Sequence, residues 1–225
     1  MSASVETYPE IREGVAKLCT RFSGSYWRAL DREMAHPTEF VNALTEAGWL
    51  SILIPEEYGG SGLPLSAAAA VLEEIQRAGC NIGACHAQMY TMGTLLRYGS
   101  DAQKRLYLPQ IASGALRLQA FGVTEPSSGT DTGALKTTAV LQGETYVMNG
   151  QTVWTSRAEH SDLMLLLART KALREGIKKT EGLSVLLVDM RQALGNGLTI
   201  RPIRTMMNLP RRKCSSTTCG FRRKI

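Results

Sequence analysis

The sequence has no apolar run of the length that a membrane-spanning helix needs. Its longest candidates, residues 67–72 and 163–168, are short and adjoin charged residues. The N-terminus, M-S-A-S-V-E-T-Y-P-E, has no basic stretch followed by an apolar one, as a secretory signal peptide would. With 44% hydrophobic and 20% charged residues, the composition is that of a soluble globular protein. We therefore expect a cytoplasmic protein without a membrane span.

Cysteine and histidine are too scattered to indicate a metal site or a disulfide framework. None of the five cysteines belongs to a C-x-x-C motif, and the three histidines lie far apart in the sequence. We expect reduced thiols and no metal. The residues concerned are Cys19, Cys80, Cys85, Cys214, Cys219, His36, His86 and His160.

Two short patterns imitate known motifs without meeting their requirements. The glycines of 59–62, G-G-S-G, lack the G-x-G-x-x-G spacing and do not open a strand-to-helix turn, so a Rossmann dinucleotide site is rejected. Residues 160–162, H-S-D, have the residue types of a hydrolase triad, but neighbours in sequence rarely converge in space. Nucleophilic catalysis is therefore not expected.

The excess positive charge is confined to one end of the chain. The sequence has 26 Lys and Arg against 20 Asp and Glu, a net charge of +6. Residues 209–225 contain six basic residues and no acidic one, so the remaining 20 basic residues balance the 20 acidic ones. Such a run is typical of a solvated tail, and we expect 209–225 to be disordered and not to bind nucleic acid.

Residues 1–118 show helical periodicity, which a loop with Pro and Gly interrupts at 49–64. Apolar residues recur at helical spacing, proline or serine begins three of the segments, and glycine follows most of their ends. Ser100 is a plausible N-cap. We predict an all-α N-terminal domain over 1–118, with helices at 9–35, 37–47, 65–78, 82–98 and 100–112.

From about residue 118 the pattern changes to short runs rich in Thr, Val and Tyr. Strands that follow strands without intervening helices predict an antiparallel barrel or sandwich rather than a parallel sheet. Asn149-Gly150 is the strongest short hairpin signal, and Gly143-Glu144 separates two further runs. The fold class predicted is multidomain α and β: the helical domain is followed by an antiparallel β-barrel domain over 119–208.

Several separated motifs resemble those of one enzyme family. The segment 121–131, F-G-V-T-E-P-S-S-G-T-D, followed by 149–157, N-G-Q-T-V-W-T-S-R, is similar to the flavin-binding signature of acyl-CoA dehydrogenases. I-P-E-E-Y-G-G-S-G and Y-G-S-D-A-Q-K-R-L-Y-L-P-Q-I-A-S-G precede it in the family's order and spacing. The resemblance covers residues 9–208, nearly the whole chain.

The resemblance implies an oxidoreductase of fatty acid metabolism, a flavoprotein with FAD as cofactor. Such an enzyme takes a proton from the carbon α to the thioester and transfers a hydride from the β carbon to flavin N5, which desaturates the acyl-CoA substrate. Intact members of the family are homo-oligomers and pass electrons to an acceptor flavoprotein. We expect these properties of the family to which the chain is similar.

The resemblance also implies cofactor-binding residues by motif position. Thr124 would hydrogen-bond the N1/O2 end of the flavin, with backbone groups near Val123 assisting, since fixed donors there favour the reduced, negatively charged ring. Ser156 would face N5, and Trp154 would pack on the ring face away from substrate. Phe121 stands where the family frequently has Tyr, which keeps the ring and drops a hydroxyl.

The loop that follows Thr124 would approach the substrate. Thr130 would contact the acyl-CoA, at a position where the family often has Ser, so a hydroxyl is retained. Ser127 and Ser128 stand where Gly-Ala is familiar.

The C-terminal residues depart from the family pattern. After T-M-M the family pattern expects N-H-A-T-T-E-V-F-F-D-D-L-R-I-P-A-E-N-L, whereas this chain has N-L-P-R-R-K-C-S-S-T-T-C-G-F-R-R-K-I. With suitably chosen codons, one deleted nucleotide converts the first peptide into the second and places a stop after it. This frameshift hypothesis predicts that 209–225 is out of frame, that the barrel has lost its last strand, and that the C-terminal helical domain with the family's catalytic glutamate is missing.

Three functional hypotheses follow. A C-terminally truncated acyl-CoA dehydrogenase would be inactive or nearly so, since losing a positioned base costs about 10²–10⁴ in rate. No catalytic residue is therefore assigned within the chain. The alternative is a non-catalytic remnant that binds flavin weakly or not at all. A nucleic-acid binder would instead show salt-sensitive retention on DNA that vanishes when 209–225 is removed.

Overall fold

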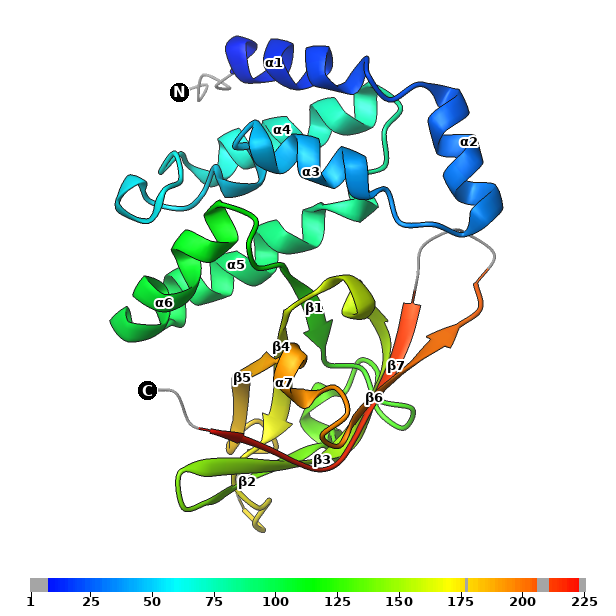
Figure 1. The fold of residues 1–225 in the computed structure, drawn as a ribbon. Coiled ribbons are helices and arrows are strands. Elements are labelled where there is room, and N and C mark those ends of the chain that lie inside the picture. Colours follow the sequence, from blue (N-terminus) through cyan, green and yellow to red (C-terminus); the bar gives the residue numbers. More distant parts are fainter. Residues whose placement is uncertain (1–7, 177, 206–210, 223–225) are drawn as a thin grey trace. The chain divides into compact units, whose positions relative to one another are not determined.

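The structure is a computed structural model and describes residues 8–176, 178–205 and 211–222 (Figure 1). It divides into two compact units, Met1–Leu116 and Arg117–Ile225. The division lies two residues before the end of the predicted helical domain. The change from helical to strand periodicity in the sequence therefore coincides with a change of compact unit.

The first unit is helical in the part of the chain that the structure describes. Short 3₁₀ turns at Trp49–Ser51, Glu56–Tyr58 and Ile82–Ala84 connect its longer elements. Each predicted helical segment contains at least one helix. The α-helices are α1 (Pro9–Cys19), α2 (Gly24–Glu33), α3 (Thr38–Glu46), α4 (Leu65–Arg77), α5 (His86–Tyr98) and α6 (Asp101–Ala112) (Figure 1).

The predicted N-cap of the last helix is confirmed. The Gln103 backbone N–H donates to the Ser100 hydroxyl at 3.2 Å, and the Gln103 side-chain oxygen accepts from the Ser100 N–H at 2.9 Å. This reciprocal capping box satisfies two N–H groups near the start of α6.

The prediction of one helix over 9–35 is wrong, because the chain breaks between α1 and α2. Phe22 lies in the break and its ring packs edge-on against Tyr26 and Phe40, each at 5.1 Å between ring centroids. The Trp27 indole N–H donates to the Phe22 carbonyl at 3.2 Å and stabilises the turn. The apolar spacing continues through this corner, so periodicity alone could not locate it.

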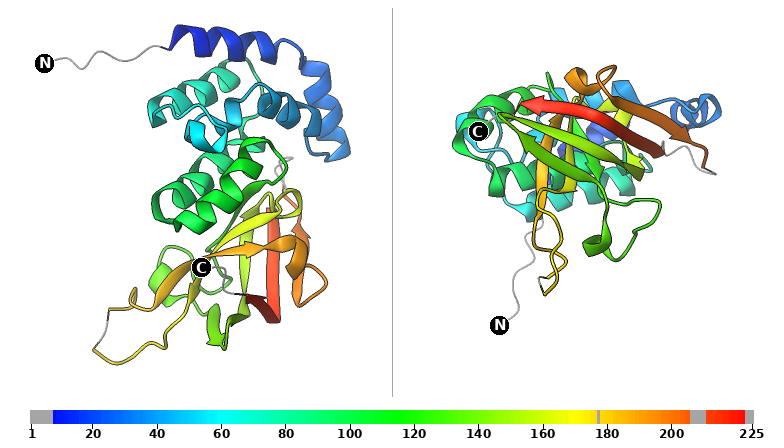
Figure 2. Two further views of the ribbon diagram at one scale, coloured as in Figure 1. Left: turned by 60° about the vertical axis from the view of Figure 1, so that its left-hand side comes forward. Right: turned by 90° about the horizontal axis from the view of Figure 1, so that it is seen from below.

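The second unit is a curled sheet that forms part of a barrel (Figures 1 and 2). The short helix α7 (Met190–Ala193) follows the fifth strand. The strands are β1 (Leu118–Gly122), β2 (Thr138–Gln142), β3 (Thr145–Ser156), β4 (Leu163–Arg169), β5 (Leu183–Asp189), β6 (Leu198–Ile203) and β7 (Arg211–Arg222).

The strand order is β1-β4-β2-β3-β7-β6, and β5 also pairs with β4. Most pairs are antiparallel, as the pattern predicted, but β1 pairs with β4 in parallel, and β2 meets β4 in parallel at one position. Residues such as Met148, Leu166 and Val188 bury their side chains in a common core on the inside of the curl. The predicted fold class, a helical domain followed by an incomplete β-barrel, is confirmed.

The hairpin prediction at Asn149-Gly150 is wrong. The turn between β2 and β3 is at Gly143-Glu144, and Gly150 lies inside β3 next to a register shift. A Cβ atom at Gly150 would lie 2.3 Å from the Thr137 hydroxyl and 2.7 Å from its Cα atom. Glycine is therefore required at position 150 for the close approach of two segments and not for a turn.

The prediction of a disordered tail and a lost last strand is wrong for Arg211–Arg222. These residues form β7, which pairs antiparallel with β3 on one side and β6 on the other. Main-chain pairing does not require a particular side chain, and the small side chains of Cys214 and Ser216 alternate into the buried face. Residues 209–210 and 223–225 of the predicted tail lie outside the described residues.

Candidate flavin wall

The last part of β3 contains a β-bulge. Thr152 pairs with Cys214 and Thr155 pairs with Arg212, so three steps along β3 match two along β7. Trp154 lies within the extra segment, with φ +62°, a conformation that residues other than glycine rarely adopt. Its side chain is 53% exposed, while Thr152 and Thr155 are buried. The bulge therefore directs a large aromatic side chain out of the sheet.

The end of β1 joins β3 at this bulge. The Val153 N–H donates to the Thr124 carbonyl at 2.8 Å. Gly122 allows the approach, because a Cβ atom there would lie 3.0 Å from the Leu166 side chain and 3.3 Å from that of Thr152. The two segments of the predicted signature, 121–131 and 149–157, are thus adjacent in space.

A buried carboxylate holds the turn that follows. Glu125 is 6% exposed, and its carboxylate accepts from the backbone N–H groups of Lys136 at 2.7 Å and Thr137 at 2.6 Å. The Glu125 and Ser128 backbones also bond each other across the turn, at 2.9 and 3.2 Å. Glu125 thereby ties the loop after β1 to the start of β2.

The structure brings most of the predicted cofactor residues to one region. Thr124 and Trp154 are adjacent through Val153, and Ser156 ends the same strand. Thr130 lies in an exposed part of the loop, six residues beyond Thr124, where its carbonyl accepts from the Thr132 N–H. The remaining predicted residues are on or directly after β1: Phe121, which is 38% exposed, and the half-buried Val123.

A surface cleft of about 460 Å³ lies beside the same turn. The Thr137 hydroxyl at its edge is buried and has no hydrogen-bond partner among the residues that the structure describes. Most of the residues that line it are of polar type; they are Glu125, Pro126, Ser127, Lys136, Thr137, Thr138, Asn149, Gly150 and Gln151.

Sequence analysis missed Glu125, Thr152 and Thr155 as determinants of this geometry. The acid of a T-E-P turn gives no sign that it binds backbone groups more than ten residues later. The two threonines give no sign in the sequence either, because residues three apart lie on opposite faces of a regular strand and their common burial is seen only in the structure. Two buried hydroxyls at that spacing indicate a bulge.

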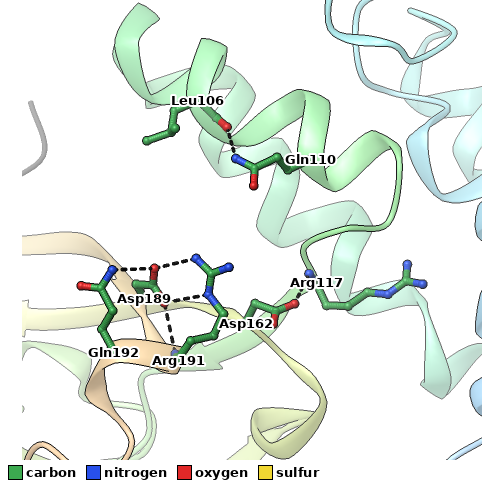
Figure 3. A network of polar contacts seen from close by, with 7 residues as sticks. All are labelled: Leu106, Gln110, Arg117, Asp162, Asp189, Arg191 and Gln192. Carbon is green, nitrogen blue, oxygen red and sulfur yellow. Dashed lines mark hydrogen bonds and ion pairs between the residues drawn. The ribbon is translucent and has the colours of Figure 1, made fainter.

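The residues of the H-S-D pattern have structural contacts. The Ser161 hydroxyl donates to the Arg157 carbonyl at 2.9 Å. The Asp162 carboxylate accepts from the Arg117 N–H at 2.7 Å and fixes the start of β1 beside that of β4 (Figure 3). Both contacts serve the sheet.

Asp189, at the end of β5, caps α7 and faces Arg191 and Gln192 (Figure 3). The Arg191 guanidinium donates to its two carboxylate oxygens at 3.1 and 2.7 Å. Burial raises the pKa of Asp189, but the hydrogen bonds and charge of Arg191 lower it by more, so that the pKa lies below its ordinary value. This ion pair stabilises the corner between β5 and α7.

Neither a metal cluster nor a membrane-spanning helix is found among the described residues. No group of three or more His, Cys, Asp or Glu residues in the described ranges could hold a metal ion. Within those ranges, no helix has both the length and the apolar character to cross a bilayer.

Two family models match the chain. "Acyl-CoA dehydrogenase, N-terminal domain" matches residues 6–115, and "Acyl-CoA dehydrogenase, middle domain" matches residues 120–220. The second match includes most of β7, which the sequence analysis had placed outside the family pattern. The two matches meet where the structure divides into its two units.

Relatives and solved structures agree with these matches. The chain is 37% identical over 168 residues to acyl-CoA dehydrogenase FadE26 of Mycobacterium tuberculosis, which covers 75% of this chain and 41% of that protein. It superposes on the ChsE4-ChsE5 complex of Mycobacterium tuberculosis with a TM-score of 0.82 and 30% identity, over 99% of this chain and 56% of that one. An acyl-CoA dehydrogenase of Geobacillus kaustophilus shares the fold, with a TM-score of 0.87 and 23% identity, over 96% of this chain and 57% of that one.

The helical unit followed by a half-barrel is the acyl-CoA dehydrogenase fold. The chain belongs to the acyl-CoA dehydrogenase family. It spans about half the length of the relatives that it matches.

Proposed function

We propose that the β unit forms one wall of an FAD site in an acyl-CoA dehydrogenase that desaturates acyl-CoA thioesters between the α and β carbons. The observation that carries the proposal is the hydrogen bond from the Val153 N–H to the Thr124 carbonyl, at 2.8 Å. It joins the two signature segments into one surface. The half-exposed Trp154 at the bulge gives that surface a flat apolar group of the kind that a planar ring stacks on.

The residues of this wall suit a flavin ring. The hydroxyl of Thr124 and the N–H of Val123 would donate to the end of the ring where negative charge develops on reduction. The Ser156 hydroxyl would lie toward the reacting nitrogen, and Trp154 would keep water from one ring face. Phe121 would add apolar surface beside them. When bound, FAD supplies the acceptor for the hydride that leaves the β carbon.

The same loop would bind the substrate. Thr130 is exposed and lies beyond the turn that Glu125 holds in place. We propose that its hydroxyl contacts the acyl-CoA. An electron-acceptor flavoprotein and assembly into homo-oligomers are proposed by family membership.

The test of the flavin wall is a titration of the purified protein with FAD, followed by the visible absorption and fluorescence of the flavin. Trp154→Ala is expected to weaken binding about tenfold, equivalent to about 1.4 kcal/mol for a lost stacking surface. The matched control is Leu194→Ala, which truncates another half-exposed apolar side chain of the same unit and leaves affinity unchanged. Equal affinity of the Trp154→Ala and unmodified proteins would contradict the proposal.

We further propose that a polypeptide of these 225 residues has little dehydrogenase activity by itself. The carboxylate closest in sequence to the wall, Glu125, is buried and bound by two backbone N–H groups, so it is unsuited to take a proton from substrate. Without a positioned base the rate falls by about 10²–10⁴. Turnover of an acyl-CoA with an artificial electron acceptor at ordinary rates would refute this; a protein that neither turns over nor binds FAD would be the non-catalytic alternative.

A further inference from the structure

The bulge in β3 changes which side chains are buried. In a regular strand, residues three apart lie on opposite faces. Thr152 and Thr155 are three apart and are 3% and 1% exposed, so both face the interior. The extra residue opposite β7 produces this change of phase.

The two buried hydroxyls bond each other. The Oγ1 atoms of Thr152 and Thr155 are 3.0 Å apart, and either can be the donor. The bond spans the two residues between them, one of which is Trp154. The bond therefore joins the two ends of the bulge on the buried face of the sheet, where the backbone leaves the extended conformation.

Trp154 has a backbone conformation that needs such support. Its φ of +62° is unfavourable for a residue with a Cβ atom and persists only when the surroundings determine it. A change at either neighbour of the bulge would let the backbone return to an extended form. The side chain of Trp154 would then turn back toward the sheet.

Thr152 also lies close to the other half of the wall. Its Cγ2 and Oγ1 atoms each lie 3.3 Å from the position that a Cβ atom at Gly122 would take. Gly122 directly precedes Val123 and Thr124. The hydroxyl pair thus lies beneath both segments of the wall.

From this geometry we infer that the Thr152–Thr155 hydroxyl pair is a positioning element, which holds Trp154 in the orientation that the proposed flavin site uses. The inference rests on the proposed function in one respect, namely that flavin binding is the reason for this orientation of Trp154. The orientation itself can be measured without flavin.

The test compares variants that remove or keep the hydroxyls. Thr152→Val/Thr155→Val replaces each hydroxyl with a methyl group of similar shape. Because both hydroxyls are removed, neither is left buried without its partner, and the protein is expected to unfold near the original temperature. Thr155→Ser keeps the hydroxyl and is the conservative variant. Thr199→Val, an exposed position on β6, makes the same chemical change away from the bulge.

The first readout is the ¹⁹F NMR spectrum of protein labelled with 5-fluorotryptophan. The sequence has three tryptophans, and the resonance absent from Trp154→Phe is that of Trp154. The double variant is expected to shift or broaden this resonance, whereas Thr155→Ser and Thr199→Val leave it in place. An unchanged Trp154 resonance in the double variant would overturn the inference.

The second readout is the FAD dissociation constant of the same proteins. The double variant is expected to bind about five- to tenfold more weakly, the factor that corresponds to the net contribution of one hydrogen bond. If no protein binds FAD but the Trp154 resonance moves, the flavin proposal fails and the positioning role stands. If all bind FAD equally and the resonance is unchanged, the positioning role fails alone.

Discussion

At the scale of single residues, Glu125 shows how a side chain of the signature serves the fold. Its carboxylate is buried and accepts from two backbone N–H groups at the start of β2. Because these are hydrogen bonds to a charged group, each contributes about 1.5–3 kcal/mol. The turn that leads to Thr130 depends on both.

We predict that Glu125→Gln destabilises the protein by about 1.5–3 kcal/mol, since the amide has one acceptor oxygen where the carboxylate has two. Denaturant unfolding measures the loss. Glu144→Gln, at the exposed turn between β2 and β3, is the matched control and should change stability by less than about 0.5 kcal/mol. A Glu125→Gln protein as stable as this control would show that the two N–H groups find other partners.

Cys19 gives a prediction for the helical unit. Burial, with the neighbouring Cys80, raises the pKa of the Cys19 thiol from 9.0 to about 12. Since the folded state favours the neutral thiol, this group's contribution to stability is complete below pH 9 and is lost as the pH rises toward 12.

The unfolding free energy should therefore fall more steeply with pH above 9 in the unmodified protein than in Cys19→Ala. Chemical denaturation at a series of pH values from 7 to 11 measures both slopes. The difference between them removes the titration of other groups. Parallel curves over this range would show that the thiol titrates normally.

Among the helices and strands, some boundaries follow from local sequence patterns, and others depend on contacts with distant segments. The α6 helix begins at Ser100 as predicted, because the capping box with Gln103 lies within four residues of sequence. The corner at Phe22 was missed, since its cause is the packing of Phe22 against Tyr26 and Phe40. The Asn149-Gly150 hairpin was misplaced because glycine is needed at position 150 for the close approach of Thr137, which lies on another segment.

Gly150→Ala tests that explanation. The new methyl group would meet the backbone and side chain of Thr137 at 2.3–2.7 Å, so one of the segments must move. We expect a loss of about 1–3 kcal/mol in thermal or denaturant unfolding, as for other overpacked sites. Gly129→Ala, where a Cβ atom meets nothing within 4 Å, is the control. If the two variants were equally stable, the tight approach between Thr137 and β3 would not exist in solution.

At the scale of the whole molecule, the sequence indicated two domains and the family, and the structure and comparisons bear both out. The basic charge of 209–225 gave the wrong answer for β7, because the chain there satisfies the open main-chain groups of β3 and β6 through its backbone. Charge predicts where a side chain prefers to lie. It does not predict whether a strand's neighbours need a partner.

The roles of Phe121, Val123, Thr124, Trp154 and Ser156 come from motif position and stay predictions. What the fold adds is their convergence, through the Val153–Thr124 hydrogen bond and the bulge at Trp154. We propose that these two segments form a single surface that binds a flavin.

Amide chemical-shift mapping tests that claim most directly. FAD is added to ¹⁵N-labelled protein, and the shift of each backbone N–H is followed. We expect the largest changes to occur together at 121–124 and 153–156, on both sides of the Val153–Thr124 hydrogen bond. Changes confined to one of these segments, or centred elsewhere in the chain, would contradict it.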